Sequence, residues 1–359
     1  MQNPSSLTNS RQWGQNAPKS FERSPLNQYL HACIMQDQDI AALRELIPAH
    51  QPFHVLFFTV INYLLLSEEG QLHPFAAFHP YFTSNPRPVQ ESYPYFRDFC
   101  LEHIADLRRL LPTARLQTNE VTRCANFLPV FELVYQRGGC RPLALIEIGT
   151  SAGFNLSWDR YAYTYHATDN TVYTIGDAAS PVQINCTLQG ASLPQLPETM
   201  PVVASRVGID LMPLDCLKEQ DVRWLRACIW PEETWRYHLL DAVLAVAQQN
   251  PPRILSGDAC DLLPNLLSAI PAEHTVCLYH SYALLQNPAL VRERIFAQLA
   301  AHSSTRDLYR ISLEWDQPNQ WPTPRLELFT YQSGEQVCQE RLANCDVHGG
   351  TMQWLFTDV

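Results

Sequence analysis

The sequence predicts an α/β protein: a Rossmann-like, doubly wound sheet of about seven strands, with an N-terminal helical cap domain and a small β insertion. Two observations predict this fold class. Before residue 140 the apolar residues recur at helical spacing, whereas after it short apolar runs alternate with helical segments, as in a parallel sheet. We therefore divide the chain into a disordered tail (1–24), a helical cap domain (25–140) and a core domain (141–359) with an insertion at 161–204.

The first part of the chain is expected to be helical after a disordered tail. Residues 1–24 are polar with scattered Arg and Lys and contain no apolar segment of the kind that a signal peptide needs. From about Pro25 to Gln136 the apolar residues return at helical spacing, for example at Phe53, Leu56, Phe57, Val60, Ile61 and Leu64. Prolines crowd the stretch from Phe82 to Tyr95, which we interpret as a connection between helices.

Seven short apolar runs after residue 140 predict the strands of the sheet. They are LALIEI (143–148), RVGIDL (206–211), RILS (253–256), TVCLYH (275–280), LYRISLE (308–314), RLELFTY (325–331) and TMQWLF (351–356). Most are separated by helical segments, such as 221–247 and 289–301, which is typical of parallel pairing. The last two runs have only polar residues between them, so we expect an antiparallel hairpin at one edge. Alternating Tyr, Thr and Val after Tyr161 predict the β insertion.

Composition narrows the class of partner. The 359 residues carry a net charge of −11, which opposes binding to nucleic acid because that affinity depends on clustered basic residues. The longest apolar run, Phe53–Leu66, contains His54 and Asn62 and is too short to span a bilayer. The 11 cysteines include no pair at metal-ligand spacing, so we expect reduced thiols and no metal site. We predict a cytoplasmic protein with a small-molecule substrate, and the sequence does not predict an oligomeric state.

The stretch LIEIGTSAGFNL (145–156) is the strongest candidate for a ligand-binding loop. A strand end, a tight glycine turn and a helix start let backbone amides approach a ligand, and an acid there can hold an ammonium group. Ser151 stands where the dinucleotide motif has its middle glycine, so the loop favours a nucleoside without a pyrophosphate. The predicted binding residues of this loop are Glu147, Gly149, Ser151, Gly153 and Asn155. A glycine turn with nothing bound is the alternative.

Acids follow two further predicted strands. Asp210, with Leu211 after it, can accept hydrogen bonds from two ribose hydroxyls, since a carboxylate has two acceptor oxygens. Asp258 can pair with an adenine amino group while the amide of Ala259 contacts the ring. Ligands of open α/β sheets lie at the carboxyl ends of the strands, so these two acids and Glu147 are expected to meet. The alternative for each is a helix N-cap.

A third candidate segment, QTNEVTR (117–123), precedes the first strand. Gln117, Asn119 and Arg123 are suited to bind a carboxylate, and Arg123 is the best suited because its guanidinium binds in a bidentate manner. The segment is equally compatible with a plain helix start, in which Arg123 pairs with Glu120 or Glu132 on a solvated face.

The sequence resembles a bacterial family known mainly as a domain of unknown function, whose core is similar to class I S-adenosylmethionine-dependent methyltransferases. The motifs that carry the resemblance are QTNEVTRCANFLP (117–129), LALIEIGTSAGFNLSWDRYAYTY (143–165), RVGIDLMPLDC (206–216), WLRACIWPE (224–232), GDACDLLP (257–264) and HGGTMQWL (348–355). The resemblance implies that S-adenosylmethionine is the cofactor or sole substrate. It places Glu147 near the methionine amino group, Asp210 at the ribose, and Asp258 with Ala259 at the adenine.

Two departures from the methyltransferase pattern bear on the reaction. The insertion at 161–204 separates Asp210 from the glycine loop by more than is usual. The fourth predicted strand is followed by YHSYALL (279–285), where amino-methylating members have Asn or Asp, two prolines and an aromatic residue. Methylation of an amide or nucleobase nitrogen is therefore not expected.

Residues at the end of the fourth predicted strand, together with tyrosines after the first helix of the core, are candidates for the chemistry. Tyr282 and Tyr161, or its neighbours Tyr163 and Tyr165, offer aromatic faces for cation–π contact with a sulfonium. His280 is a candidate base and Ser281 a candidate for orienting the substrate. The alternatives are packing for the tyrosines and a structural role for the histidine.

Several reactions remain open at such a site. Methyl transfer to a small acceptor is the default. The alternative is attack of the methionine amine on its own chain, giving methylthioadenosine and a cyclic amino acid, for which the amine must be neutral and Glu147 clear of it or neutralised. The letters GTSAG also fit the nucleophile elbow of a serine hydrolase, for which chain order allows a triad of Ser151, Asp316 and His348. A fold that only binds a nucleotide or a protein partner is the last alternative.

Overall fold

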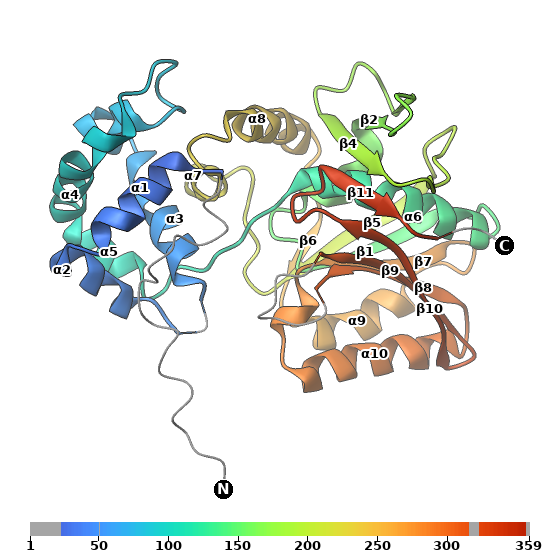
Figure 1. Ribbon diagram of the computed structural model, residues 1–359. Coiled ribbons are helices and arrows are strands. Elements are labelled where there is room, and N and C mark those ends of the chain that lie inside the picture. Colours follow the sequence, from blue (N-terminus) through green and yellow to red (C-terminus); the bar gives the residue numbers. More distant parts are fainter. Residues whose placement is uncertain (1–22, 50, 316–322, 357–359) are drawn as a thin grey trace, which may run out of the picture. The chain divides into compact units, whose positions relative to one another are not determined.

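The computed structural model describes residues 23–49, 51–315 and 323–356. The chain divides into two compact units (Figure 1). The helical unit consists of the residues up to Thr118 together with Leu217–Asp241, and the sheet unit consists of Asn119–Cys216 and the residues from Ala242 onward. The mixed α/β prediction is confirmed at this level.

The helical unit is built around one apolar helix. Its helices are α1 (Pro25–Ile34), α2 (Gln38–Ala41), α3 (Phe53–Leu65), α4 (Ser92–Glu102), α5 (Ile104–Leu110), α7 (Glu219–Ala227) and the first part of α8 (Thr234–Gln249), with 3-10 turns η3 (Ala42–Leu46), η4 (Gly70–Leu72), η5 (Pro74–Phe78) and η6 (Val89–Glu91). Helix α3 is apolar on nearly every face and packs among its neighbours in a single hydrophobic core. A helix that is apolar all round is stable only when it is surrounded, which explains its central place.

The segment 217–241 joins the N-terminal helices through buried polar contacts. Glu232 accepts hydrogen bonds from Ser24 Oγ (2.6 Å) and from the amide of Leu26 (2.7 Å), which is one of the unpaired amides at the start of α1. The helical stretch expected at 221–247 is two helices, α7 and α8, because Pro231 lies between them.

Five parallel strands form the part of the sheet that begins with the glycine loop. They are β1 (Leu143–Ile148), β5 (Val203–Asp210), β6 (Ile254–Ser256), β7 (Thr275–Ser281) and β8 (Leu308–Glu314), and they lie in the order β6-β5-β1-β7-β8. Strands β1, β7 and β8 are buried along nearly their whole length, since both faces of the sheet are covered there. The order changes direction at β1, because the chain adds β5 and β6 on one side and then β7 and β8 on the other.

The expected seven-strand sheet with an edge hairpin is wrong. Within the described residues the sheet has eleven strands, and its remaining ones are β2 (Ala162–His166), β3 (Val172–Ile175), β4 (Gln183–Gln189), β9 (Arg325–Gln332), β10 (Glu335–Cys345) and β11 (Thr351–Trp354). Strands β9 and β11 do not pair with each other, because β10 lies between them. The sheet continues from β11 to β4, β2 and β3, so the insertion belongs to the same sheet. The first half of β10 is polar and exposed, and it therefore has no apolar pattern to detect.

Helices cover the two faces of the parallel strands. Helices α9 (Ala259–Ser268) and α10 (Ala289–Ser303) share a hydrophobic cluster with Val276 and Leu278 of β7. Helix α6 (Cys124–Arg137) places Phe127 and Phe131 against Tyr279, which alternates with those residues along β7 and so points to the other face. Figure 1 shows α9 and α10 on the side of the sheet away from α6.

The segment after the glycine loop is shorter than an ordinary helix. It is a 3-10 segment, η8 (Phe154–Arg160), with a kink at Ser157, and the chain then enters β2. The expected helix from Gly153 is thus a short 3-10 segment. Among the helices of the described residues, none is long and apolar enough to cross a membrane.

The buried His79 predicts a pH-dependent stability of the helical unit. Burial lowers the pKa of His79 to about 3, and its Nδ1 accepts from the amide of Tyr81 (3.2 Å). The unfolded chain binds a proton below about pH 6.5 and the folded chain does not, so the free energy of unfolding falls by about 1.4 kcal/mol per pH unit from about 6.5 down towards 3. In urea unfolding at pH 7 and 5.5, His79→Asn should reduce this pH dependence. His238→Asn, at an exposed histidine of the same unit, should leave it unchanged, and parallel behaviour of the two variants would refute the prediction.

Candidate functional site

The loop after β1 is tied to a buried carboxyl group. Glu147, the second-last residue of β1, accepts from Thr150 Oγ1 and from Asn155 Nδ2 (3.3 Å). Burial raises the pKa of Glu147 to about 8, against the opposing effect of these two donors. The carboxyl group is therefore mostly protonated at neutral pH. Both of its oxygens are engaged by the loop that follows it.

The turn itself requires its glycine. Gly149 has a φ of +72°, and a Cβ built on it would lie 2.3 Å from Cβ of Ala283, in the loop after β7. Ser151 also has a positive φ, +54°, and its amide donates to Oδ2 of Asp210 (2.8 Å). Ser151 Oγ is buried and has no hydrogen-bond partner among the described residues. Asp316, the acid proposed for a hydrolase triad, lies outside those residues.

The other two residues of the predicted loop have structural partners. Gly153 has a φ of +74° and packs against Pro252 and Ile254, where a Cβ would stand 2.9 Å from the proline ring. The side chain of Asn155 lies between Glu147 and Cys124, since its Oδ1 accepts from the Cys124 thiol (3.4 Å).

The acids at the ends of β5 and β6 hold backbone amides. Asp210 accepts from Ser151 through Oδ2 and from Met212 through Oδ1 (2.9 Å), so it links the loops after β1 and β5. Asp258 is the N-cap of α9, and its Oδ1 accepts from the amide of Cys260 (2.8 Å). Ala259 is the first residue of that helix. Leu211, directly after Asp210, leaves 60% of its surface exposed.

A second cluster of polar side chains lies on β7 and β8. Nδ1 of His280 lies 2.8 Å from Oε1 of Glu314, and Nε2 lies 3.1 Å from the guanidinium of Arg310. The same Glu314 oxygen accepts from the amides of Ala283 (3.1 Å) and Leu284 (2.7 Å). Burial lowers the pKa of His280, so the ring is neutral and both of its nitrogens are engaged. His280 has no nitrogen left to act as a base, contrary to the role considered from the sequence.

Arg123 is held beside this group. It donates to Ser281 Oγ (3.1 Å) through Nη1 and to the carbonyl of Val347 (3.0 Å) through Nε. Its guanidinium lies 4.3 Å from the centroid of the Tyr282 ring, a cation–π geometry. Gly349 passes so close that a Cβ would stand 2.6 Å from the amide nitrogen of Arg123. The charge of Arg123 is thus fixed in a buried place next to the end of β7.

The residues that precede Arg123 in the sequence contact other parts of the chain. Nδ2 of Asn119 donates to the carbonyl of Thr150 (2.9 Å), which joins this segment to the glycine loop. Glu120 accepts from Thr122 Oγ1 and lies 3.4 Å from Nδ1 of His348. Gln117 belongs to the helical unit, where its carbonyl accepts from the thiol of Cys228 (3.5 Å).

The three tyrosines proposed after the loop are packed within the sheet unit. Each is at most 1% exposed, and each hydroxyl donates to a backbone carbonyl: Tyr161 to Phe154, Tyr163 to Trp158 and Tyr165 to Ala125. Their hydroxyls are therefore engaged in structure, as the packing alternative expected.

Three polar side-chain atoms around the loops have no hydrogen-bond partner within the part of the chain that the structure describes. Among the described residues, Asn119 Oδ1, Ser151 Oγ and the Tyr282 hydroxyl are buried without a hydrogen bond. Leaving a buried polar atom unpaired costs about 1–3 kcal/mol, so such atoms point to a ligand or water. The three lie in segments that meet at the carboxyl ends of β1 and β7, where the strand order changes direction. These atoms mark this edge of the sheet as the candidate site.

Several residues of this edge were missed from the sequence. Glu314 is the last residue of β8, just as Glu147, Asp210 and Asp258 mark the ends of β1, β5 and β6. An acid at a strand end is therefore the sequence signal that identifies it. Thr150 and Arg310 act through side-chain contacts that no spacing reveals. A hollow of about 480 Å³ lies elsewhere in the unit, lined by Pro129, Leu133, residues 191–195, Trp354 and Phe356, and none of the predicted site residues lines it.

Fold and site together define a mixed α/β protein whose polar groups gather at the carboxyl ends of parallel strands. Residues 12–354 match a family described as "uncharacterized protein conserved in bacteria (DUF2332)", and the chain belongs to this family. No curated protein matches the chain.

Gly149→Ala tests the close approach of the two loops. The substitution should destabilise the chain more than Gly139→Ala does, because Gly139 has the same φ of +72° but no atom within 4 Å of its Cβ position. Backbone strain of about 1–2 kcal/mol is common to both, and the clash with Ala283 is added only at Gly149. In thermal unfolding, Ala283→Gly should restore part of the loss in Gly149→Ala. Equal losses in the two single variants would contradict this packing.

Proposed function

We propose that the sheet unit binds S-adenosylmethionine at the carboxyl ends of β1, β5, β6 and β7 and transfers its methyl group to a small-molecule acceptor. The observation that supports this proposal is a glycine turn at the point where the strand order reverses, beside buried polar atoms that have no hydrogen-bond partner in the described part of the chain. Nucleotide ligands of open α/β sheets bind at this position. The parallel order β6-β5-β1-β7-β8 supports the same assignment, because it is that of a doubly wound sheet.

The nucleoside end of the ligand is assigned to β5 and β6. Asp210 is proposed to accept from the ribose hydroxyls in addition to the amides of Ser151 and Met212, since the two oxygens of a carboxylate together offer about four lone-pair sites. Asp258 and Ala259 are proposed to contact the adenine. Leu211 is exposed directly after Asp210 and offers an apolar surface for the ring.

The amino-acid end is assigned to the other half of the edge. Arg123 is proposed to bind the carboxylate of the methionine moiety, because its charge is buried and held by Ser281, Val347 and Tyr282. Asn119 Oδ1 and Ser151 Oγ are proposed to accept from the amino group. Glu147 acts through the loop, since its oxygens already bind Thr150 and Asn155.

The sulfonium requires an aromatic partner other than Tyr282. Tyr282 already carries the Arg123 guanidinium on its ring, and a second cation on that ring would be repelled. We therefore assign Tyr282 as a positioning residue for Arg123. Trp315, whose ring centroid lies 4.4 Å from that of Tyr282, is the nearer candidate for contact with the sulfonium.

Methyl transfer places modest demands on the protein. A sulfonium is a reactive electrophile, so alignment of the acceptor and exclusion of water suffice. His280 cannot take a proton from the acceptor while both of its nitrogens are engaged. The acceptor is therefore expected to be a nucleophile that needs no base. A hydrolase would need a base at Ser151 Oγ, which has no hydrogen-bond partner among the described residues.

Asp210→Asn should weaken binding of S-adenosylhomocysteine about ten- to hundredfold, because it replaces charged hydrogen bonds to the ribose worth about 1.5–3 kcal/mol. Asparagine keeps an acceptor for the Ser151 or Met212 amide, which limits damage to the loop. Asp177→Asn is the matched control, since Asp177 is exposed and also accepts from the amide two residues on. Isothermal titration calorimetry of the wild type and both variants decides. No binding by the wild type would overturn the proposal, and equal binding by all three would remove Asp210 from the site.

One observation favours a second outcome at the same site. Cyclisation of the methionine chain, with release of methylthioadenosine, needs an amine that is not held as an ammonium by a carboxylate. Glu147 meets this condition, because burial raises its pKa to about 8 and Thr150 and Asn155 occupy its oxygens. The amine must lose its proton to solvent water before it attacks, because both nitrogens of His280 are engaged; the new C–N bond then replaces the C–S bond to the departing methylthioadenosine.

Incubation of the protein with S-adenosylmethionine alone separates the two reactions. Methyl transfer predicts no turnover without an acceptor and S-adenosylhomocysteine once one is supplied, whereas cyclisation predicts methylthioadenosine from the start. Mass spectrometry of the nucleoside products distinguishes them, with Arg123→Lys as the variant expected to slow either reaction. Methylthioadenosine formed by the wild type and lost in Arg123→Lys would replace methyl transfer by the second reaction.

A further inference from the structure

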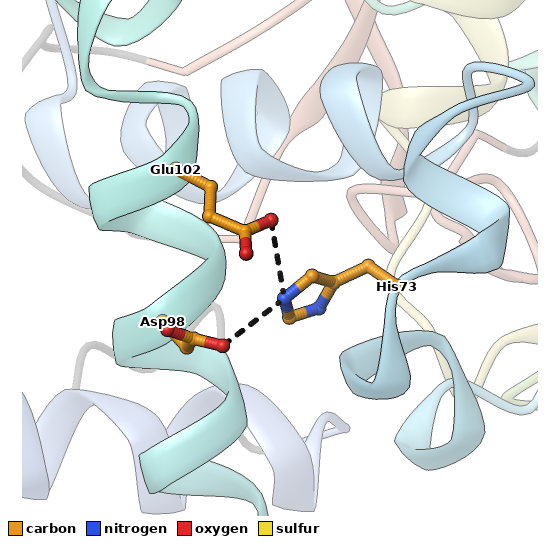
Figure 2. A group of neighbouring side chains, drawn as sticks. All are labelled: His73, Asp98 and Glu102. Atoms are coloured by element: carbon orange, nitrogen blue, oxygen red, sulfur yellow. Dashed lines mark ion pairs between the residues drawn. The ribbon is translucent and has the colours of Figure 1, made fainter.

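We propose that His73, Asp98 and Glu102 of the helical unit bind a divalent transition-metal ion, with Zn²⁺ best matched to their donor atoms. One ring nitrogen and one oxygen from each carboxylate lie within 4.8 Å of one another (Figure 2). The proposal is independent of the function proposed for the sheet unit, because all three residues belong to the helical unit.

The sequence brings the three side chains together through helix α4 and the turn before η5. Asp98 and Glu102 are four residues apart on α4 and therefore lie on the same face of the helix. His73 is the N-cap of η5, and its ring packs against Phe99 of α4 with the centroids 5.1 Å apart. Figure 2 shows the imidazole pointing towards α4 between the two carboxylates.

The burial of His73 and the position of its Nε2 point to an ion. Its side chain is 7% exposed, and Nε2 lies 3.6 Å from Asp98 Oδ2 and 3.7 Å from Glu102 Oε2. These distances are too long for hydrogen bonds, and Nε2 has no hydrogen-bond partner among the described residues. Ligand atoms about 2.1 Å from one tetrahedral ion stand about 3.4 Å apart, which is close to this spacing.

The donor set selects the kind of ion. One imidazole with two carboxylates suits Zn²⁺ and neighbouring transition metals, whereas Mg²⁺ and Ca²⁺ prefer oxygen donors alone. The two carboxylates also neutralise the charge of a dication. Asp98 and Glu102 are 65% and 59% exposed, so their side chains can move towards the ion and water can complete its coordination.

Binding requires a change at the other ring nitrogen. The amide of Phe75 donates to Nδ1 of His73 (3.1 Å), so the neutral ring carries its proton on Nε2 in the metal-free chain. An ion at Nε2 shifts this proton to Nδ1 and displaces the Phe75 amide. The ion therefore competes with the cap of η5 and, once bound, ties this turn to α4.

Zinc titration of matched variants tests the site. Metal-free protein is titrated with ZnCl₂ by calorimetry, and thermal unfolding is followed with and without the ion. Asp98→Asn/Glu102→Gln removes the exposed ligands, and His73→Asn removes Nε2 but keeps a capping acceptor for Phe75. Glu68→Gln is the control, an exposed acid next to η4. Because the chain has 11 cysteines and 12 histidines, the comparison rests on the difference between variants.

The proposal predicts that the wild type and Glu68→Gln bind Zn²⁺ at least about tenfold more tightly at one site than the two ligand variants, and that only they gain in unfolding temperature. In ¹⁵N spectra of the histidine rings, Zn²⁺ should move His73 from the Nε2–H to the Nδ1–H form. Equal zinc binding and equal unfolding temperatures in all four proteins would overturn the proposal. Should His73→Asn fail to fold, the double variant with its exposed positions decides alone.

Discussion

The turn after β1 is held by carboxyl groups from two neighbouring strands, and the candidate site depends on this arrangement. Glu147 binds the side chains of Thr150 and Asn155, while Asp210 binds the amide of Ser151. Neither Gly149 nor Gly208 has space for a larger side chain, since a Cβ at Gly149 would strike Ala283 and a Cβ at Gly208 would strike Thr150. The loops after β1, β5 and β7 are therefore fixed as one group, with Ser151 in the left-handed region.

Most polar side chains at this edge already bind other groups of the protein. These contacts determine which side chains a ligand can use. Glu314 anchors the loop after β7 and holds His280, which removes the histidine from proton transfer. Arg123 is fixed on Tyr282 with its charge buried. A fixed cation near β7 and carboxylates near β5 and β6 favour a ligand with an anionic end and a hydroxyl-bearing end, as an amino acid joined to a nucleoside has.

The parallel part of the fold could be predicted because its strands are buried on both faces. The runs at 143–148 and 308–314 coincide with β1 and β8 in full. Strand β10 could not be predicted, because its polar, exposed first half has no alternation, and without it the pairing of β9 and β11 was assigned wrongly. Partners more than a hundred residues apart, such as Glu232 with Ser24, leave no local signal either.

The site was predictable only in its outline. Acids and glycines at strand ends identify the edge of the sheet, because the carboxyl ends of parallel strands meet there. The sequence does not say how each acid is used: Asp258 caps a helix and Glu147 binds its own loop. The position of Tyr282 under Arg123 depends on contacts between segments far apart in the chain, which is why we propose Trp315 in place of Tyr282 for contact with the sulfonium.

A crystal structure of the protein with S-adenosylhomocysteine tests the central claim most directly. The nucleoside should lie along the carboxyl ends of β5 and β6, with both ribose hydroxyls on Asp210 and the amino-acid carboxylate on Arg123. A ligand bound anywhere else, or loops after β1 and β7 that remain empty at saturating ligand, would contradict it.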